Sequence, residues 1–155
     1  MPAWSHIKKG EPEFADTVEQ LFGRGRHKTI ATLRRDGSPR ISGIECEFVE
    51  GELRFGSMLG ARKLADLLRD PRFALHGPTI HPEPGQESAW PGEAKIAGRA
   101  YRAGPVASDD DHPLEGETFV ADIDEVVVTH LNPQGTKLVV EWWTLEQGRQ
   151  RIERE

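Results

Sequence analysis

Cysteine is nearly absent from this chain of 155 residues, in which Cys46 is the single example. An intrachain disulfide and a metal site built from several cysteines are therefore excluded. Long apolar runs are absent too. No stretch approaches the roughly 20 residues of a membrane-spanning helix, and residues 1–14 lack the apolar segment of a signal peptide. We therefore expect a cytoplasmic protein with no membrane partner.

An excess of basic side chains is also missing. The chain carries 20 basic and 26 acidic side chains, which gives a formal net charge of -6. Nucleic-acid-binding domains normally show a basic excess, so we expect no nucleic acid partner. The length and the composition, with 36% hydrophobic and 30% charged residues, are typical of one soluble domain that spans residues 1–155.

Two segments have the apolar spacing of amphipathic helices, at residues 13–22 and 61–70. The apolar face of the second segment is predicted to consist of Leu64, Leu67 and Leu68. Asp66 falls on its polar remainder, and Pro71 ends the helix because the residue before a proline avoids the helical conformation. Residues 1–12, rich in Pro, Gly and Lys, are predicted to form an irregular N-terminal arm.

Most of the remaining chain consists of short apolar or alternating segments separated by turn residues. The predicted strands lie at 27–35, 39–49, 53–57, 72–76, 95–103, 118–123, 125–131 and 137–145. In the second of them the expected core residues are Ile41, Ile44, Cys46 and Phe48. Residues 77–92 are predicted to form a long binding loop or flap. With about seven or eight strands, two helices and no alternation of strand and helix, the pattern predicts a mainly β fold, an antiparallel β-barrel with two or more peripheral helices.

The helix at 61–70 begins with the wrong charges. A helix N-terminus exposes unpaired N–H groups and acts as a partial positive charge, so a capping side chain and acidic residues usually stand there. Here Gly60 or Ala61 occupies the cap, and Arg62 and Lys63 follow, each disfavoured by roughly 0.3–1 kcal/mol. A phosphate bound at the helix start would make the positions of both cations favourable instead of unfavourable.

Ser57, at the end of the preceding strand, could add a hydroxyl donor to such a phosphate site. The alternative is that Arg62 and Lys63 are merely solvated on an exposed face. The segment is not a nucleotide-binding P-loop, because the spacing of glycines before a Lys-Ser or Lys-Thr pair is absent.

Residues 27–102 resemble the pyridoxamine 5′-phosphate oxidase-like, FMN-binding split β-barrel family, and residues 118–154 resemble it loosely. The most specific element is the strand, loop and helix around the cationic helix start. Its matching positions are Ser57, Arg62, Lys63, Asp70, Pro71 and Arg72. Gly56 departs from the family pattern, in which an aromatic residue is common at that position.

The resemblance implies an antiparallel split β-barrel that forms a homodimer, with FMN in a groove between the two barrels. It implies that Arg62, Lys63 and Ser57 hold the FMN phosphate. The strand expected beside the flavin contributes Arg40, Ile41, Ser42 and Gly43. Trp142 or Trp143 would reach the cofactor, and Trp142 is our candidate. Because neighbours on a strand face opposite sides, one of the two should be in the core.

The function that follows is a flavin-dependent oxidoreductase acting on a small-molecule substrate. Oxidation of vitamin B6 is not expected, because the C-terminal VEWWTLEQGRQRIER lacks the histidine of the true oxidase's ending. Some relatives use the deazaflavin F420 and others bind haem, so an F420-dependent reductase and a non-catalytic flavin- or haem-binding protein are the alternatives. No side chain stands out as a catalytic acid or base.

A metal site is not expected. His76 and His81 flank a Gly-Pro turn without a neighbouring cysteine or acidic cluster and without helical i,i+4 spacing, and residues 109–112 (Asp-Asp-Asp-His) lack the spacing of a calcium loop. Cys46 lies in an alternating strand and is predicted to be a small core residue rather than a nucleophile.

Overall fold

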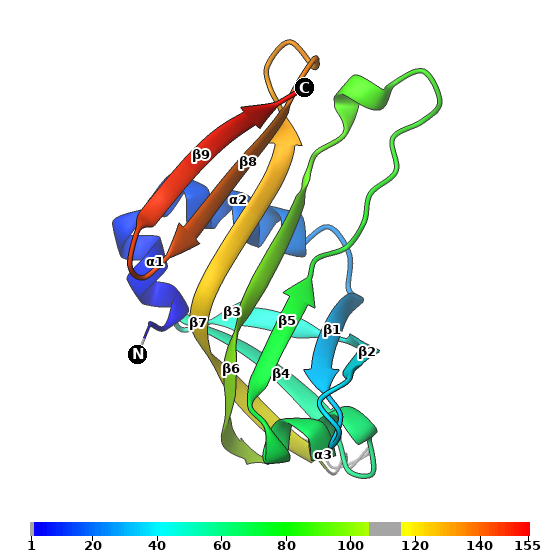
Figure 1. Cartoon of the computed structure of the whole chain (residues 1–155), viewed down its shortest axis with the longest axis vertical. Helices are drawn as coiled ribbons and strands as arrows, with labels where there is room; N and C mark the ends of the chain where they lie inside the picture. Colours follow the sequence, from blue (N-terminus) through cyan, green and yellow to red (C-terminus); the bar gives the residue numbers. More distant parts are fainter. Residues whose placement is uncertain (1, 106–115) are drawn as a thin grey trace.

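An antiparallel sheet of nine strands organises the part of the chain that the computed structural model describes, residues 2–105 and 116–155 (Figure 1). The strands, in chain order, are β1 (Lys28–Leu33), β2 (Pro39–Ile44), β3 (Cys46–Val49), β4 (Glu52–Met58), β5 (Arg72–His76), β6 (Glu93–Pro105), β7 (Gly116–Leu131), β8 (Leu138–Thr144) and β9 (Gly148–Arg154). The helices are α1 (Trp4–Gly10), α2 (Pro12–Phe22), α3 (Arg62–Arg69) and the short 3-10 helix η1 (Glu87–Ala89).

The long strand β7 divides the sheet into two regions. The strand order is β2-β1-β5-β6-β7-β4-β3, and β8 and β9 extend from the other half of β7. Residues 116–120 of β7 pair with β4, whereas residues 125–131 pair with β8. Because β2 and β3 end the path without pairing with each other, the barrel stays open. The predicted antiparallel split barrel with peripheral helices is confirmed.

Two tight hairpins connect β1 to β2 and β3 to β4. The turn between β1 and β2 is closed by Asp36, whose Oδ1 accepts a hydrogen bond from the backbone N–H of Ser38 at 2.9 Å. In the turn between β3 and β4, Glu50 and Gly51 both have positive φ, at 51° and 78°. Two consecutive residues of this kind form the turn that matches the twist of an antiparallel hairpin. The first hairpin carries residues 34–36 to the side of α3.

The N-terminal residues correct one prediction. Within residues 1–12, where an irregular arm was expected, residues 4–10 form the helix α1, and Trp4 and Ile7 are fully buried. The ring of Trp4 lies 4.7 Å from that of Phe48 between centroids. Burial of two large apolar side chains stabilises a helix that is too short to persist alone. Helix α2, predicted at 13–22, is confirmed.

The predicted core face of residues 39–49 is partly wrong. Ile44 is buried and Cys46 and Phe48 pack against the core, but Ile41 is 75% exposed. In a regular strand residues three positions apart face opposite sides, so Ile41 and Ile44 cannot both point inward within β2. The more buried positions Arg40, Ser42, Ile44, Cys46 and Phe48 continue with one parity past the break at Glu45, and Ile41 has the opposite parity, so it points outward.

The C-terminal half holds longer strands than predicted. The segments predicted at 118–123 and 125–131 belong to the single strand β7, and the polar tail forms the edge strand β9. The register shift between Ala97 and Gly98 in β6 agrees with the bulge that Gly98 indicates. Residues 77–92 form a loop interrupted only by η1. Residues 109–112 lie outside the described residues.

Candidate functional site

Helix α3 begins as the sequence predicts. Its cap residue Ala61 makes no side-chain hydrogen bond, and its first turn contains no acidic residue. Gly60, with a φ of 83°, reverses the chain just before it. Arg62 and Lys63 therefore stand at the positive end of the helix, and among the described residues neither has an ion-pair partner.

The two cations diverge from the helix start into different pockets. Successive helical residues are about 100° apart around the axis, so Arg62 and Lys63 cannot point the same way. Lys63 lines a pocket of about 370 Å³ together with Ile44, Glu45, Gly56, Ser57 and Met58, and Glu45 is paired there with Arg26. We call it the Lys63 pocket. Arg62 lines a separate pocket of about 470 Å³.

Ser57 is the most unusual residue of the Lys63 pocket. Only 3% of it is exposed, and its Oγ makes no hydrogen bond to any described residue. A buried hydroxyl without a partner costs about 1–3 kcal/mol, and such a group in a native structure calls for an explanation. A ligand that accepts a hydrogen bond beside Lys63 would remove that cost.

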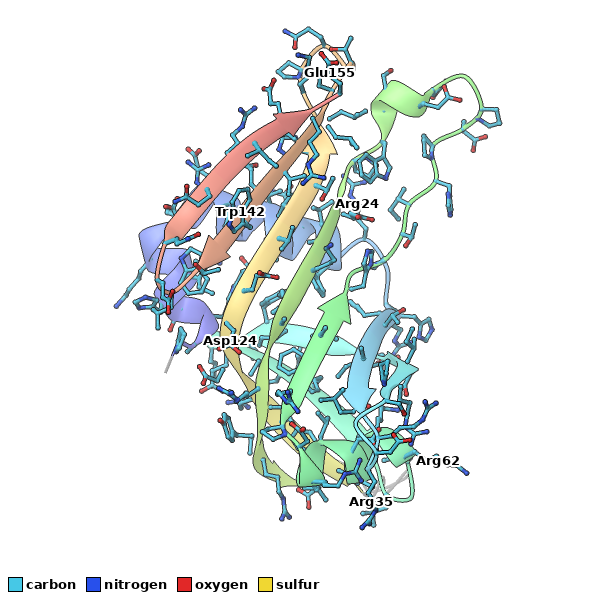
Figure 2. The ribbon with its side chains drawn as sticks, in the orientation of Figure 1. Arg24, Arg35, Arg62, Asp124, Trp142 and Glu155 are labelled. Carbon is cyan, nitrogen blue, oxygen red and sulfur yellow. The ribbon has the colours of Figure 1, made fainter. Side chains whose placement is uncertain are left out.

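The second pocket, which we call the arginine pocket, collects basic side chains from three elements (Figure 2). It is lined by Arg34, Arg35, Asp36, Arg40, Arg62, Ala65, Asp66 and Arg69. Five arginines face two aspartates there, so the pocket is strongly basic on a chain whose net charge is -6. Some of its arginines are held by hydrogen bonds: the Nη1 of Arg34 donates to the carbonyl of Pro39 at 3.0 Å.

Asp66 is the buried centre of this pocket. Its Oδ2 accepts hydrogen bonds from Thr32 Oγ1 at 2.8 Å and Arg40 Nε at 2.7 Å, and its Oδ1 accepts one from Arg69 Nη2 at 2.8 Å. Burial raises the pKa of Asp66, but these donors outweigh burial and hold the pKa below its usual value. The carboxylate thus stays charged and fixes Arg40 and Arg69 at the pocket wall.

The buried position of Asp66 corrects the predicted helix face. Leu64 and Leu67 are buried as expected, but Leu68 is exposed and Asp66 takes a buried place. Three donors compensate the carboxylate for its lost hydration, so the helix turns this residue inward. Sequence reasoning missed Asp66, Arg34, Arg35 and Arg69 as site residues; the only signal was the pairing of Asp66 and Arg69 at i,i+3.

The residues expected beside the flavin ring are separated. Arg40 turns toward Asp66 in the arginine pocket, whereas Ile41 projects from the opposite face of β2 into a third pocket of about 280 Å³. Small residues such as Ala31 and Ala74 line that pocket too. Ser42 is half-buried and Gly43 is exposed.

Trp142 lies far from this end of the molecule. Figure 2 places it on β8 in the upper half of the view, while Arg62 lies near the lower end. Trp143 is buried in the core and Trp142 is half-buried, which confirms that the two face opposite sides. Within one chain, Trp142 is therefore not brought together with Arg62 or Lys63.

Other candidate groups offer little chemistry. Burial raises the pKa of the Cys46 thiol to about 11, which disfavours the reactive thiolate. Within residues 2–105 and 116–155, no group of three or more His, Cys, Asp or Glu side chains is arranged to hold a metal ion. None of the helices described combines the length and the apolar character that crossing a bilayer requires.

Comparison with known proteins identifies the fold. No family model and no curated protein matches the sequence. A solved pyridoxamine 5′-phosphate oxidase-related, FMN-binding protein from Nostoc punctiforme is similar in structure, with a TM-score of 0.62, 12% identity and 96% of each chain covered. An F420 reductase matches with a TM-score of 0.53 and 17% identity, over 70% of this chain and 94% of its own.

A haem-binding protein from Mycobacterium smegmatis matches with a TM-score of 0.55 and 12% identity, over 99% of this chain and 88% of its own. The expected resemblance is thus confirmed at the level of fold: the chain has the split-barrel fold of pyridoxamine 5′-phosphate oxidase-related FMN-binding proteins. Because proteins with this fold bind different cofactors, the fold does not select among them.

Proposed function

We propose that the chain binds FMN at the start of α3 and uses it in a redox reaction on a small-molecule substrate. The observation that carries this proposal is the start of α3, where an uncapped helix N-terminus and Lys63 stand beside Ser57; among the described residues Lys63 has no ion-pair partner and the buried Oγ of Ser57 has no hydrogen-bond partner. A phosphate monoester satisfies all three, because it accepts hydrogen bonds from the backbone and the hydroxyl and carries negative charge.

Each residue then has a defined task. Lys63 supplies a point charge to the phosphate and Ser57 donates its Oγ–H. Arg62 adds positive potential from the neighbouring face of the same helix turn. The exposed Ile41, with Ala31 and Ala74 beside it, offers an apolar surface for a planar ring system.

Bound FMN would supply the electron-transfer chemistry itself, and the protein would orient it and exclude water. No acid or base is assigned, because no titratable side chain of the Lys63 pocket stands out for proton transfer.

We further propose that two copies of the chain form the working unit. Trp142 is too distant from α3 to serve the same cofactor within one chain, so it contributes only if a second copy brings its β8 to the groove. Size-exclusion chromatography with light scattering measures this directly. If the protein is a monomer and Trp142→Ala leaves its affinity for FMN unchanged, Trp142 is not part of the cofactor site.

The phosphate assignment is tested by comparing FMN with riboflavin, which lacks the phosphate. Binding is followed by quenching of flavin fluorescence. Lys63→Gln combined with Arg62→Gln should weaken FMN binding by about 100-fold while riboflavin binding changes little, since each charge-assisted contact is worth roughly 1.5–3 kcal/mol. Lys9→Gln, an exposed lysine on α1, is the control and should change neither. Equal FMN affinity in the folded double variant and the wild type would reject the proposal.

Cofactor choice is tested by adding FMN, F420 or haem to the purified protein and recording the visible spectrum. Turnover only with reduced F420 would favour an F420-dependent reductase. Binding of haem or FMN without any reoxidation or substrate reduction would favour a non-catalytic binding protein.

A further inference from the structure

The loop at residues 77–92 rests against the end of β7 and the turn that follows it (Figure 1). In η1, Ser88 lies against Gly135 of that turn, where an added Cβ would lie 3.1 Å from the Cβ of Ser88. At the end of the loop, Gly92 has a φ of 98°, and a Cβ added there would lie 3.1 Å from the Cβ of His130. The seat of the loop therefore depends on how the end of β7 is held.

His130 holds the end of β7 through both of its ring nitrogens. Nδ1 lies 2.8 Å from the carbonyl oxygen of Leu131, the last residue of β7, and Nε2 lies 2.9 Å from Oε2 of Glu141 on β8. The other carboxylate oxygen of Glu141 accepts a hydrogen bond from Nη1 of Arg149 at 2.8 Å. A carbonyl oxygen and an arginine-paired carboxylate only accept hydrogen bonds, so both ring nitrogens must carry a proton. Only the positively charged form of histidine has two N–H groups.

The charges around His130 are mainly negative. Glu141 faces the ring from β8, and on the β6 side the neighbour is a glycine. Arg149 of β9 connects Glu141 to Glu11, which lies between α1 and α2, because its Nε donates to Oε2 of Glu11 at 3.2 Å. Glu13 of α2 lines the same small pocket as these three residues. Three carboxylates thus face one arginine, and a positively charged ring offsets part of the excess.

Loss of the ring proton removes one of the two hydrogen bonds. A neutral imidazole has one N–H group and one lone pair, so one ring nitrogen then faces an acceptor with its own lone pair. The lost bond is charge-assisted, and it is replaced by a repulsion. Histidine is the side chain whose charge ordinarily changes between about pH 5 and 8.

We propose that His130 is a pH-sensitive clamp on the loop at residues 77–92. The doubly protonated ring ties the end of β7 to β8 and keeps the loop seated against the following turn. As the pH rises and the ring loses a proton, the end of β7 loosens and the loop is released. The clamp does not depend on flavin binding.

The test is NMR spectroscopy of the isotope-labelled full chain without cofactor, between about pH 5 and 8. Long-range correlation of the ring nitrogens reports whether both nitrogens of His130 are protonated. The nuclear Overhauser effect between Ser88 and Gly135 reports whether the loop is seated. It should be strong while the ring is charged and fade as the ring titrates.

Hydrogen exchange at the end of β7 gives the magnitude. The amide of Asn132 donates to the carbonyl of Lys137 at 3.0 Å, directly after the clamp. Its exchange, corrected for the chemical rate at each pH, should become about tenfold faster when the ring is neutral, the effect of losing one hydrogen bond to a charged group. Amides of α2 should show no such change.

Two variants should shift the response in opposite directions. In His130→Gln no ring remains to make both bonds, so the loop should be released at either end of the pH range. In Glu141→Gln the amide offers its oxygen to Arg149 and an N–H to a neutral ring, so the loop should stay seated at high pH. His81→Gln is the control, because His81 is an exposed histidine of the loop itself, and this variant should behave as the wild type.

The outcomes decide the proposal. A ring of His130 that is neutral at every pH, or a seated loop that does not respond when the ring titrates, would overturn it. If His130→Gln does not fold, Glu141→Gln decides alone: a loop that is released at high pH in that variant, as in the wild type, would overturn the clamp.

Discussion

Replacing Asp66 by asparagine tests the central physical argument about the arginine pocket. The substitution keeps the shape of the side chain but removes the charge that Arg40 and Arg69 share. The side chain of Asp66 is 3% exposed, whereas those of Arg40 and Arg69 are 18% and 31% exposed. Removing one partner of a buried ion pair costs roughly 3–5 kcal/mol. Asparagine retains an acceptor for Thr32, and both arginines reach some water. We therefore expect the free energy of unfolding to fall by the lower end of that range, about 3 kcal/mol.

The loss should be visible in thermal and urea unfolding followed by circular dichroism. A domain of this size loses roughly 2–4 °C in Tm for each kcal/mol, so Asp66→Asn should lower the Tm by about 6–12 °C. Asp70→Asn is the control, since Asp70 lies at the end of the same helix and pairs with Arg72 at 2.7 Å on the surface. That variant should change little, because exposed pairs contribute little to stability. If Asp66→Asn is no more destabilising than Asp70→Asn, the reasoning is wrong.

Two further predictions rest on ionisation. Because the pKa of Asp66 is lower in the folded than in the unfolded chain, its contribution is complete above the unfolded value of about 4 and is lost as the pH falls through the folded value. The urea midpoint of the wild type should therefore fall more steeply below about pH 4 than that of Asp66→Asn; parallel curves would contradict this. Since burial raises the pKa of Cys46 to about 11, the folded protein should react with a disulfide reagent at pH 7 far more slowly than the urea-unfolded chain, and equal rates would show that the thiol is accessible and ionised.

The cationic helix start is the part of the site that local sequence could predict. A cap without an acceptor, followed by Arg62 and Lys63, is visible in a few consecutive residues and depends only on helix geometry. The separation of these two side chains into two pockets was not predicted. It depends on how α3 is rotated against the sheet, which is set by Leu64 and Asp66 packing inward.

The misplacement of Ile41 has a different origin. Strict alternation over residues 39–49 places Ile41 on the face opposite to Ile44, Cys46 and Phe48, so assigning all four to the core followed their apolar character rather than the alternation. Helix α1 lacks the length to be recognised from periodicity, and it forms because Trp4 and Ile7 find a place against the barrel.

The sequence by itself determined the mainly β class, helices α2 and α3 and the charge at the start of α3, because each depends on residues close together along the chain. Only the tertiary structure decided that Asp66 is buried and that arginines from a hairpin, β2 and α3 line one pocket. Thr32 and Asp66 stand 34 positions apart in the chain. Long-range contacts of this kind follow from the pairing and packing of whole elements, which no local pattern encodes.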